Sequence, residues 1–257
     1  MVTFKGMTFN LLRFKVIDST NTYALKYLHQ YADKTVVVAD QQTKGRGRFD
    51  RRWVSDSVNN LYMSIILKPL VSDHTVESQK KIMTITPMTS LALAEVLQKY
   101  FQDTNFKLKI KWPNDVLVDE QKIAGILAET KVKGNVFTGI VVGVGINLDM
   151  SEKDLAEVGQ PATALNILLQ KKIDKEIFLK EFLEIFERNY ELLWKKGFAE
   201  FRSVYEQKLH NLGQRIFIKT SKAVYTGVLE GVDAEGALQL RQDDGNLKLL
   251  YSGEEIG

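Results

Sequence analysis

Four strand-like runs between residues 107 and 146 constrain the fold more than any other feature of this chain. The runs are residues 107–111, 116–118, 122–131 and 136–146. Short polar breaks separate them: Trp112-Pro113-Asn114-Asp115, Asp119-Glu120-Gln121 and Lys133-Gly134-Asn135. Two of these breaks are typical of hairpin turns. We therefore expect a central β-sheet in this part of the chain.

Further strands and helices are predicted on both sides of this region. Compact apolar runs predict strands at residues 11–16, 36–39 and 61–67. Several N-cap residues at 18–21 begin a helix, and apolar residues at helical spacing predict three more. These run over 87–101, from 175 to a C-terminal cap at Gly197, and over 198–209. The basic segment 44–56 shows neither a helical nor a strand period, so we expect a long loop between two buried strands.

Beyond residue 210 the pattern changes to short strands. The strand-like runs are residues 215–219, 223–232, 237–241 and 247–251, with turns rich in Asp and Gly between them. They predict a small β-barrel of about 45 residues. We expect an α+β protein with two domains: a large domain at 1–209, in which helices flank a central sheet, and a small barrel at 210–257.

Composition limits the chemistry that the chain can perform. The 257 residues are 44% hydrophobic and 26% charged, which is typical of a soluble globular protein. The longest uncharged stretch, 134–148, has 15 residues, whereas a membrane-spanning helix needs roughly 18. The chain has no cysteine, and its three histidines lie in separate segments, so we expect no Cys-based or His-based metal site and a cytoplasmic location. Any catalysis must then come from Lys, Arg, Asp, Asn and backbone groups.

The basic loop is the first candidate site. Residues 44–52 hold five cations and one carboxylate, and so dense a charge repels itself without an anion. Gly45 and Gly47 let the backbone approach a ligand closely, and the arginines offer paired donors to phosphate or carboxylate. A solvated basic loop and an RNA-binding patch of the Arg-Gly kind explain the segment equally well, so three interpretations stay open. The formal net charge of +3 is too small to indicate that the chain as a whole binds nucleic acid.

Strand ends supply the other candidates. Asn114 can read an adenine edge and Asp115 can hold Mg²⁺ or a lysine amine, although Asn-Asp after a core Trp112 is also an ordinary turn. Lys122 enters an apolar strand, either at an exposed end or facing an anion. The glycine-interrupted strand Gly143-Val144-Gly145-Ile146-Asn147 is explained by tight packing alone or by a ligand against its backbone.

Taken together, the motifs resemble the biotin protein ligase family, also called biotin-[acetyl-CoA-carboxylase] ligase. The resemblance covers nearly the whole chain, and the glycine-arginine loop combined with Lys-Trp-Pro-Asn-Asp distinguishes it from lipoate ligases, which share the fold. The matching motifs are Ser19-Thr20-Asn21, Gln42-Thr43-x-Gly45-Arg46-Gly47-Arg48-x-x-Arg51-x-Trp53, Asn60-Leu61-Tyr62, Lys111-Trp112-Pro113-Asn114-Asp115, Lys122-x-x-Gly125-Ile126-Leu127-x-Glu129 and Gly143-x-Gly145-Ile146-Asn147. One departure is Asp50, where many members have glycine.

The resemblance implies a fold, an activity and partners. The expected fold is a class II synthetase-like mixed sheet, with a catalytic domain at 1–209, followed by an SH3-like barrel at 210–257. The expected reaction converts biotin and MgATP to biotinyl-5′-AMP, and then biotinylates one lysine of a biotin carboxyl carrier domain. Only ten residues precede Leu11, so we expect the monofunctional type without a DNA-binding domain, and neither specific DNA nor a membrane as partner. An exposed central sheet often pairs in this family, so the resemblance allows a weak homodimer.

The resemblance also implies roles for individual residues. Those implied to bind biotin are Ser19, Thr20, Asn21, Gln42, Gly45, Arg46, Arg48, Lys122 and Gly125. Those implied to bind ATP or the adenylate are Arg48, Arg51, Trp53, Lys111, Asn114, Lys122 and Asn147. Lys122 and Arg48 are the catalytic cations, Asp115 orients the carrier lysine, and the phosphates of ATP hold Mg²⁺, for which no protein ligand is implied. Two alternatives remain: a lipoate or octanoyl ligase on the same scaffold, and an RNA-binding module.

Overall fold

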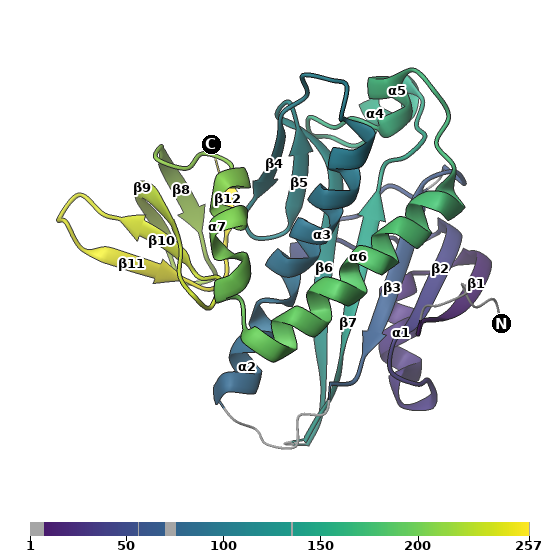
Figure 1. Cartoon of the computed structure of the whole chain (residues 1–257), viewed down its shortest axis with the longest axis horizontal. Helices are drawn as coiled ribbons and strands as arrows, with labels where there is room; N and C mark the ends of the chain where they lie inside the picture. The colour runs from purple at the N-terminus through teal and green to yellow at the C-terminus, as the bar shows by residue number, and fades with distance from the viewer. Residues whose placement is uncertain (1–7, 56, 70–75, 135, 257) are drawn as a thin grey trace. The chain divides into compact units, whose positions relative to one another are not determined.

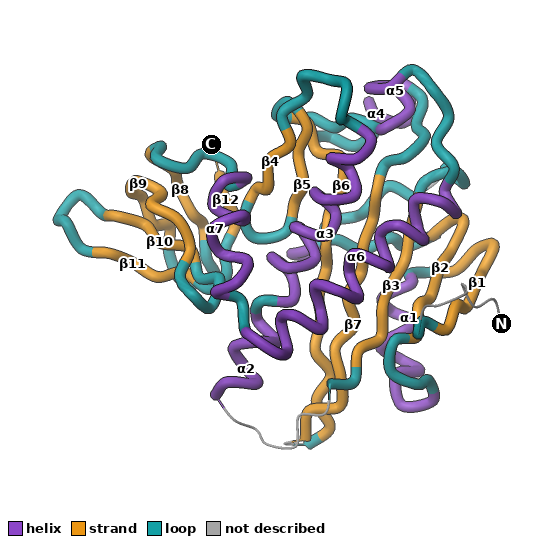
Figure 2. The backbone as a smooth tube through the Cα atoms, viewed as in Figure 1, coloured by secondary structure: helices purple, strands orange, loops and turns teal. Residues whose placement is uncertain are grey.

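The computed structural model describes residues 8–55, 57–69, 76–134 and 136–256, which belong to two compact units (Figure 1). The first unit comprises Met1–His74 and Glu120–Glu184, and the second comprises Thr75–Asp119 and Ile185–Gly257. Each unit therefore combines segments that are distant in the chain. Both units contain strands and helices (Figure 2).

Five neighbouring strands of a mixed sheet form the centre of the first unit. Their order is β1-β2-β3-β7-β6, and they are β1 (Asn10–Ile17), β2 (Thr35–Gln42), β3 (Leu61–Leu67), β6 (Gln121–Lys133) and β7 (Val136–Ile146). β1 runs parallel to β2, and all the other neighbours pair antiparallel. The expected mixed sheet with flanking helices is confirmed.

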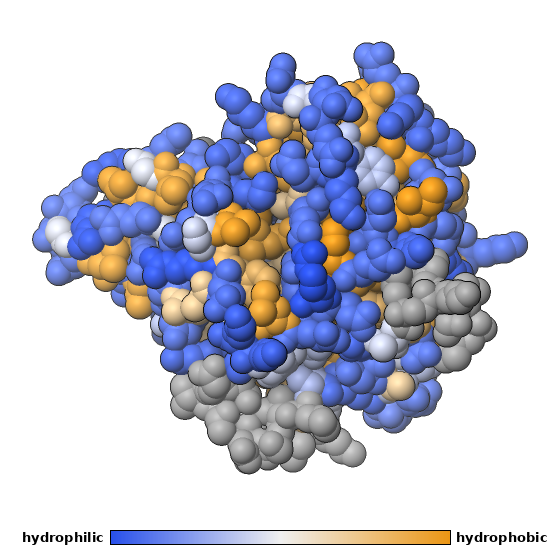
Figure 3. Space-filling view, viewed as in Figure 1, coloured by the Kyte–Doolittle hydropathy of each residue, from blue (hydrophilic) through white to orange (hydrophobic). Residues whose placement is uncertain are grey.

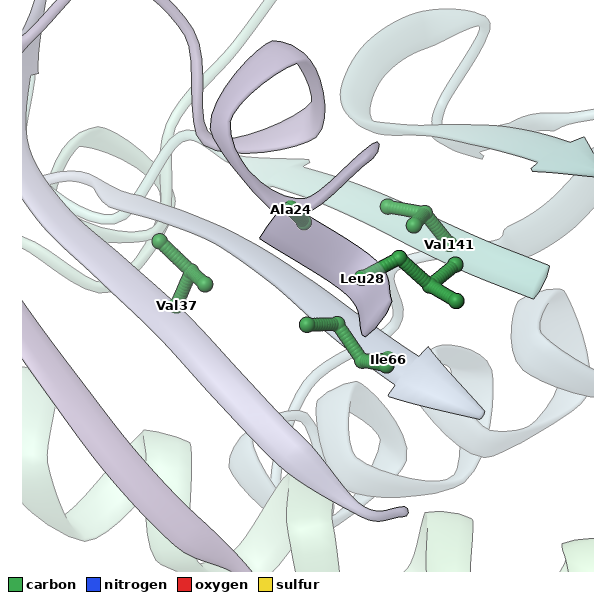
Figure 4. Packing of buried hydrophobic residues seen from close by; sticks show 5 residues of the cluster. All are labelled: Ala24, Leu28, Val37, Ile66 and Val141. Atoms are coloured by element: carbon green, nitrogen blue, oxygen red, sulfur yellow. The ribbon is translucent and has the colours of Figure 1, made fainter. Parts of the chain in front are cut away.

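Helix α1 (Thr20–Tyr27) packs on one face of this sheet. Ser19 caps its N-terminus by accepting a hydrogen bond from the backbone N–H of Thr22. Behind it, five apolar side chains form a buried cluster between helix and sheet: Ala24, Leu28, Val37, Ile66 and Val141 (Figure 4). Burial contributes roughly 1.5–3 kcal/mol for each of the larger side chains. The cluster thus holds α1 on the sheet through Ala24 and through Leu28, which follows the helix.

The second unit contains helices, a short hairpin and a separate sheet. Its helices are α2 (Val76–Met83), α3 (Ile85–Tyr100) and α7 (Ala199–Lys208), and its hairpin pairs β4 (Leu108–Lys111) with β5 (Asp115–Val118). The separate sheet is antiparallel in the order β11-β10-β9-β8-β12, with β8 (Arg215–Lys219), β9 (Val224–Val232), β10 (Leu238–Arg241), β11 (Leu247–Leu250) and β12 (Glu254–Ile256). α3 is buried along most of its length and packs against β4, β5 and α7.

Helix α6 (Lys175–Lys196) begins in the first unit and ends in the second. Two shorter helices, α4 (Glu152–Ala156) and α5 (Leu165–Leu169), were not predicted, because five residues are too few for a helical period. β12 was missed as well, since two adjacent glutamates hide any strand alternation. α3 begins two residues before the predicted start at Pro87, because a proline is tolerated in the first turn, where N–H groups have no partner within the helix.

The surface in view is mostly hydrophilic, with small hydrophobic patches (Figure 3). Among the described residues, no helix has both the length and the apolar character needed to cross a membrane.

Candidate active site

Three glycines line one face of the first unit's sheet. Gly125 on β6 lies opposite Gly145 on β7, and Gly143 lies opposite Leu127 on β6 and Ser64 on β3. Because directly paired and alternate residues share a face, all of these positions point to the same side as α1. We call Gly125, Gly143 and Gly145 the glycine floor. At these positions the backbone has no side chain between it and the groups that lie over the sheet.

Two side chains lie directly on the glycine floor. A Cβ atom added at Gly143 would lie 2.1 Å from Oδ1 of Asn21, and one at Gly145 would lie 2.5 Å from Cε2 of Trp53. A Cβ atom at Gly125 would lie 2.8 Å from the same indole. These distances are shorter than any normal van der Waals contact. Close approach by Asn21 and Trp53 therefore accounts for glycine at all three positions, in agreement with the tight-packing interpretation of Gly143 and Gly145.

The segment of residues 43–55, which we call the arginine loop, folds back on itself as a narrow hairpin. Trp53 N donates to Gly45 O at 3.0 Å, and Gly47 N donates to Arg51 O at 2.7 Å. A Cβ atom on Gly45 would lie 2.4 Å from Trp53 O, so glycine is required for the hairpin to close. The tip is a single 3₁₀ turn with Phe49 in the left-handed region at φ 54°. The loop lacks a side-chain period because backbone pairs, rather than side chains, define its shape.

Buried polar side chains join the base of the arginine loop to α1. Gln42 Nε2 donates to Ser55 Oγ at 3.0 Å, and Ser55 Oγ donates to Trp53 O at 3.1 Å. At its other end, Gln42 Oε1 accepts from both the backbone N and the hydroxyl of Thr20, at 2.8 and 3.1 Å. The Ser64 hydroxyl lies 2.8 Å from Thr20 Oγ1. Each of these side chains is less than a tenth exposed, so they form one buried chain of hydrogen bonds.

The same chain continues from Ser64 to Arg46. Ser64 Oγ lies 2.5 Å from Asn21 Oδ1, and Asn21 Nδ2 donates to Leu127 O at 3.0 Å and to Glu129 Oε2 at 2.9 Å. Glu129 in turn accepts two hydrogen bonds from Arg46, at 2.9 and 3.1 Å. The expectation that the five cations of residues 44–52 need an added anion is therefore wrong for Arg46, because a carboxylate from β6 already pairs with it.

Lys122 and Trp53 meet above the glycine floor. The Lys122 ammonium lies 5.3 Å from the centre of the Trp53 ring, a cation–π distance. It lies 3.4 Å from the point that a Cβ atom on Gly125 would occupy. The indole Nε1 of Trp53 is buried and makes no hydrogen bond to any described residue. A cation, an aromatic ring and an N–H donor without a partner among the described residues thus converge on the backbone of the glycine floor.

A segment that the sequence did not single out holds the backbone of Lys122. Lys122 N donates to Pro161 O at 3.0 Å, and Thr163 N donates to Lys122 O at 3.0 Å. Asn147 holds the same segment, because its Nδ2 donates to Thr163 O at 3.0 Å. Asn147 is 5% exposed, so in this structure it acts as a buried anchor beside Lys122.

The remaining arginines of the loop lie near its tip. The Arg48 guanidinium stands 4.8 Å from the centre of the Phe49 ring, and Phe49 is 59% exposed. Arg51 contributes its backbone to the turn, with its N–H donating to Arg48 O at 3.1 Å. Arg48 is therefore placed beside an exposed ring at the tip of the loop, whereas Arg46 is held at its base.

Three predicted site residues belong to the second unit. Lys111 and Asp115 are paired at the end of the β4–β5 hairpin, and Asn114 Nδ2 donates to Asp115 Oδ1 at 3.0 Å. Trp112 is a core residue, 5% exposed, and its Nε1 donates to Gly236 O at 3.3 Å.

A carboxylate from the C-terminal strand lies near Lys111. Burial of Glu255 acts to raise its pKa, but hydrogen bonds from His210 and Asn211 and the charge of Lys111 together hold that pKa below its ordinary value. The last strand of the separate sheet is thus coupled electrostatically to the Lys-Trp-Pro-Asn-Asp motif.

Sequence reasoning gave no role to Ser55, Ser64 and Glu129. Glu129 belongs to a quoted motif, and Ser64 interrupts an apolar strand, so both carried a detectable signal. Ser55 and the Pro161–Thr163 contacts of Lys122 carried no such signal, because the sequence does not show which loop serine or which backbone carbonyl lies close to a functional residue.

The chain is similar to several known proteins. The model of the biotin/lipoate A/B protein ligase family matches residues 13–147, and that of the biotin protein ligase C terminal domain matches residues 212–254. The bifunctional ligase/repressor BirA of Bacillus subtilis is 32% identical over 252 residues, which are 96% of this chain and 74% of that protein. The biotin--[acetyl-CoA-carboxylase] ligase of Paracoccus denitrificans is 32% identical over 87% of this chain and 91% of its own length.

A solved structure agrees with these matches. The biotin protein ligase from Aquifex aeolicus in complex with biotin and ATP superposes with a TM-score of 0.79 at 28% identity, covering 96% of this chain and 97% of that one. The expected α+β fold with a C-terminal β-domain is thereby confirmed. With a family model that spans more than half of its residues and relatives at 32% identity over most of its length, the chain belongs to the biotin/lipoate A/B protein ligase family.

Proposed function

We propose that this chain is a biotin protein ligase that works in two half-reactions. First, a carboxylate oxygen of biotin attacks the α-phosphorus of ATP, the bond to the β-phosphate breaks, and biotinyl-5′-AMP and pyrophosphate form. Then the amine of a carrier lysine attacks the acyl carbon, the bond to the phosphate oxygen breaks, AMP leaves and the amine gives up a proton. The family match and the biotin ligase relatives support this activity rather than the lipoate or RNA-binding alternatives.

The glycine floor under Trp53 and Lys122 is the observation that carries the proposal for the site. A flat bicyclic ligand with an acidic tail needs close contact with backbone, an apolar cover and a cation, and these three meet there. In this proposal, Ser19, Thr20, Asn21 and Gln42 surround the biotin head group at the start of α1. Gly45 and Gly125 allow the backbone to approach it.

Adenylate formation brings two anions together, so the site needs fixed cations. We assign this role to Lys122, whose ammonium lies beside the glycine floor. Arg48, at the tip of the arginine loop, is assigned to the phosphate of the finished adenylate, which it holds in the site. Arg46 contributes its remaining N–H donors to biotin, because Glu129 balances its charge. Trp53, Arg51 and Asn147 are assigned to the adenylate, as are Lys111 and Asn114 of the second unit.

We propose that Mg²⁺ enters with ATP, held by its phosphates. No cluster of three or more Asp, Glu, His or Cys side chains that could bind a metal occurs in the part of the chain that the structure describes. Mg²⁺ is therefore treated as part of the substrate.

The transfer step requires a carrier and a residue that receives its lysine. We assign the carrier to the biotin carboxyl carrier domain of a biotin-dependent carboxylase, and the orientation of its lysine to Asp115. The catalytic domain is proposed to comprise residues 1–209 and the C-terminal domain residues 210–257, supported by the separate family match at 212–254. The absence of cysteine fits a reducing compartment such as the cytoplasm. A weak homodimer stays a proposal.

Exchange of labelled pyrophosphate into ATP tests the first half-reaction. We expect exchange that depends on biotin and Mg²⁺ and does not occur with lipoate or octanoate. Transfer is then tested by adding a carrier domain and its Lys→Arg variant, of which only the first should become biotinylated. Exchange supported by lipoate alone would favour the first alternative. Tight, salt-sensitive RNA binding without exchange would favour the second.

A further inference from the structure

Glu129 connects two parts of the candidate site that lie far apart in the chain. Its Oε2 atom accepts from Asn21 Nδ2 at 2.9 Å, and its two carboxylate oxygens accept from Arg46 at 2.9 and 3.1 Å. Asn21 belongs to α1, which the apolar cluster fixes on the sheet, whereas Arg46 belongs to the arginine loop. The carboxylate therefore ties the loop to a rigid element.

This tie closes a ring of contacts that begins and ends on the same loop. One end is Ser55, which accepts from Gln42, and the other end is Arg46, which donates to Glu129. The intervening side chains, Thr20, Ser64 and Asn21, are each less than a tenth exposed. Two points of the arginine loop, its last residue Ser55 and Arg46 near its start, are thus linked by one chain of side-chain contacts that passes through α1. The Ser55 end is buried, but the Arg46 side chain is 40% exposed and that of Glu129 is 25% exposed.

The ion pair also gives Arg46 a different role from the other cations of the site. A bidentate carboxylate neutralises Arg46 and uses two of its five N–H donors. Lys122 lies over the Trp53 ring beside the glycine floor, and Arg48 stands at the tip of the loop beside Phe49. Arg46 therefore serves mainly to hold the loop, which agrees with the assignment of the reacting phosphate to Lys122 and of the phosphate of the finished adenylate to Arg48.

We propose that Glu129 is a positioning residue that acts through Arg46: it holds the base of the arginine loop against α1 so that the loop retains biotinyl-5′-AMP over the glycine floor. This inference rests on the proposed ligase function for its ligand, whereas the anchoring itself does not. The contacts that carry it join Glu129 to Asn21 and Arg46, neither of which is assigned to the reacting phosphate. Loss of Glu129 should therefore affect retention of the adenylate more than its formation.

The experiment compares Glu129→Gln with Glu129→Ala and with Glu176→Gln as the matched control. The glutamine side chain keeps an acceptor for Asn21 but loses the ion pair with Arg46. Glu176 makes a similar bidentate pair with Arg13, elsewhere in the same unit. The readouts are amide hydrogen exchange of residues 43–47 without ligand, the rate of adenylate formation, and the release of preformed labelled biotinyl-5′-AMP into an excess of unlabelled compound.

We expect both Glu129 variants to speed ligand-free exchange at residues 43–47 and to release the adenylate about three- to tenfold faster, the scale of a partly exposed bidentate pair. Adenylate formation should change less than about twofold. In an Arg46→Ala background, Glu129→Ala should add nothing to the release rate, because the two residues act as one unit. Glu176→Gln should leave all three readouts unchanged.

Two results would overturn the proposal. One is unchanged loop exchange and adenylate release in Glu129→Gln, since the ion pair would then anchor nothing. The other is a full effect of Glu129→Ala on release in the Arg46→Ala background, since Glu129 would then act through Asn21. A wild-type protein that makes no adenylate would instead contradict the proposed function, and loop exchange without ligand would still decide whether Glu129 anchors the loop.

Discussion

The candidate residues of the first unit and those of the β4–β5 hairpin are held in different ways. In the first unit, Glu129 joins Arg46 and Asn21 across 83 and 108 positions of the chain. At the hairpin, Asn114 donates to its own neighbour Asp115, and its backbone N–H returns to Lys111 O at 3.2 Å. The first group is a network across the fold, whereas these two hydrogen bonds of Asn114 lie within one turn.

This difference predicts how the two groups respond to substitution. Side chains in a buried network lose partners together, so one change should alter several functions of the site. A substitution in a local turn should alter only the function of the residue that is replaced. The following predictions test that contrast, beginning with the largest expected effect.

Replacing the lysine of each group by alanine should lower the rate of adenylate formation by different factors. Lys122→Ala should lower adenylate formation by about 10²- to 10³-fold, because a preorganised cation is lost beside the reacting phosphate. Lys111→Ala should lower it by about tenfold only. Biotin binding, measured by calorimetry, should change little in either variant. Equal losses in the two variants would contradict the contrast, and full activity in Lys122→Ala would contradict its role.

A methyl group on the glycine floor should disturb the network as a whole. In Gly143→Ala the new Cβ atom would collide with Asn21 Oδ1, so we expect a loss of about 1–3 kcal/mol of stability and a biotin affinity roughly 10- to 100-fold weaker. The control is Gly227→Ala in β9, where the new atom would lie 2.3 Å from Arg241 O. It should destabilise the chain and spare biotin binding. Unaltered biotin affinity in Gly143→Ala would separate Asn21 from the site.

Arg48, at the tip of the arginine loop, should affect the retention of biotinyl-5′-AMP rather than its synthesis. Arg48→Gly should still form biotinyl-5′-AMP but release it about tenfold faster, since the loop loses its clamp on the phosphate. The released adenylate should acylate albumin, which a streptavidin blot detects. Asn114→Ala, from the local turn, should slow adenylate formation without labelling albumin. An Arg48→Gly variant that makes adenylate normally and leaves albumin unlabelled would show that the clamp lies elsewhere.

The smallest effect concerns pH and the second unit. The folded-state pKa of Glu255 lies below its ordinary value of 4.5, so its ionised form stabilises the fold above that pH, and this contribution disappears as pH falls through the lower folded-state pKa. Glu255→Gln should therefore lower the melting temperature at pH 7 by roughly 2 °C, and by progressively less in acid. A difference that stays constant from pH 7 to pH 3 would mean that the charge of Glu255 plays no part.

Much of the fold could be predicted from sequence because its signals are local. The turn Trp112-Pro113-Asn114-Asp115 places β4 and β5, and the glycine after α6 is Gly197, at φ 82°, where the helix ends. The motifs also picked out residues that lie close together in the fold, since Gly143, Gly145 and Lys122 lie on or beside one floor.

The partners of those residues could not be predicted in the same way. Nothing about Arg46 in the sequence distinguishes a cation awaiting phosphate from one already paired with Glu129, because pairing depends on strand register across β6, β7 and β3. The hydrogen bond from Lys122 N to the Pro161 carbonyl could not be predicted either, since every residue has a carbonyl and the sequence does not show which one lies near Lys122. Long-range partners become visible only once the sheet is assembled.

The glycine floor limits how this site can be altered by mutation. A wall made of side chains can be trimmed to admit a larger ligand, but a floor of glycines is already at its minimum and can only become shallower. Room for a bulkier biotin analogue must therefore come from above, from Trp53 or the arginine loop. A library that seeks new substrates should vary the cover and leave Gly125, Gly143 and Gly145 fixed, because a side chain at any of the three would collide with Asn21 or Trp53.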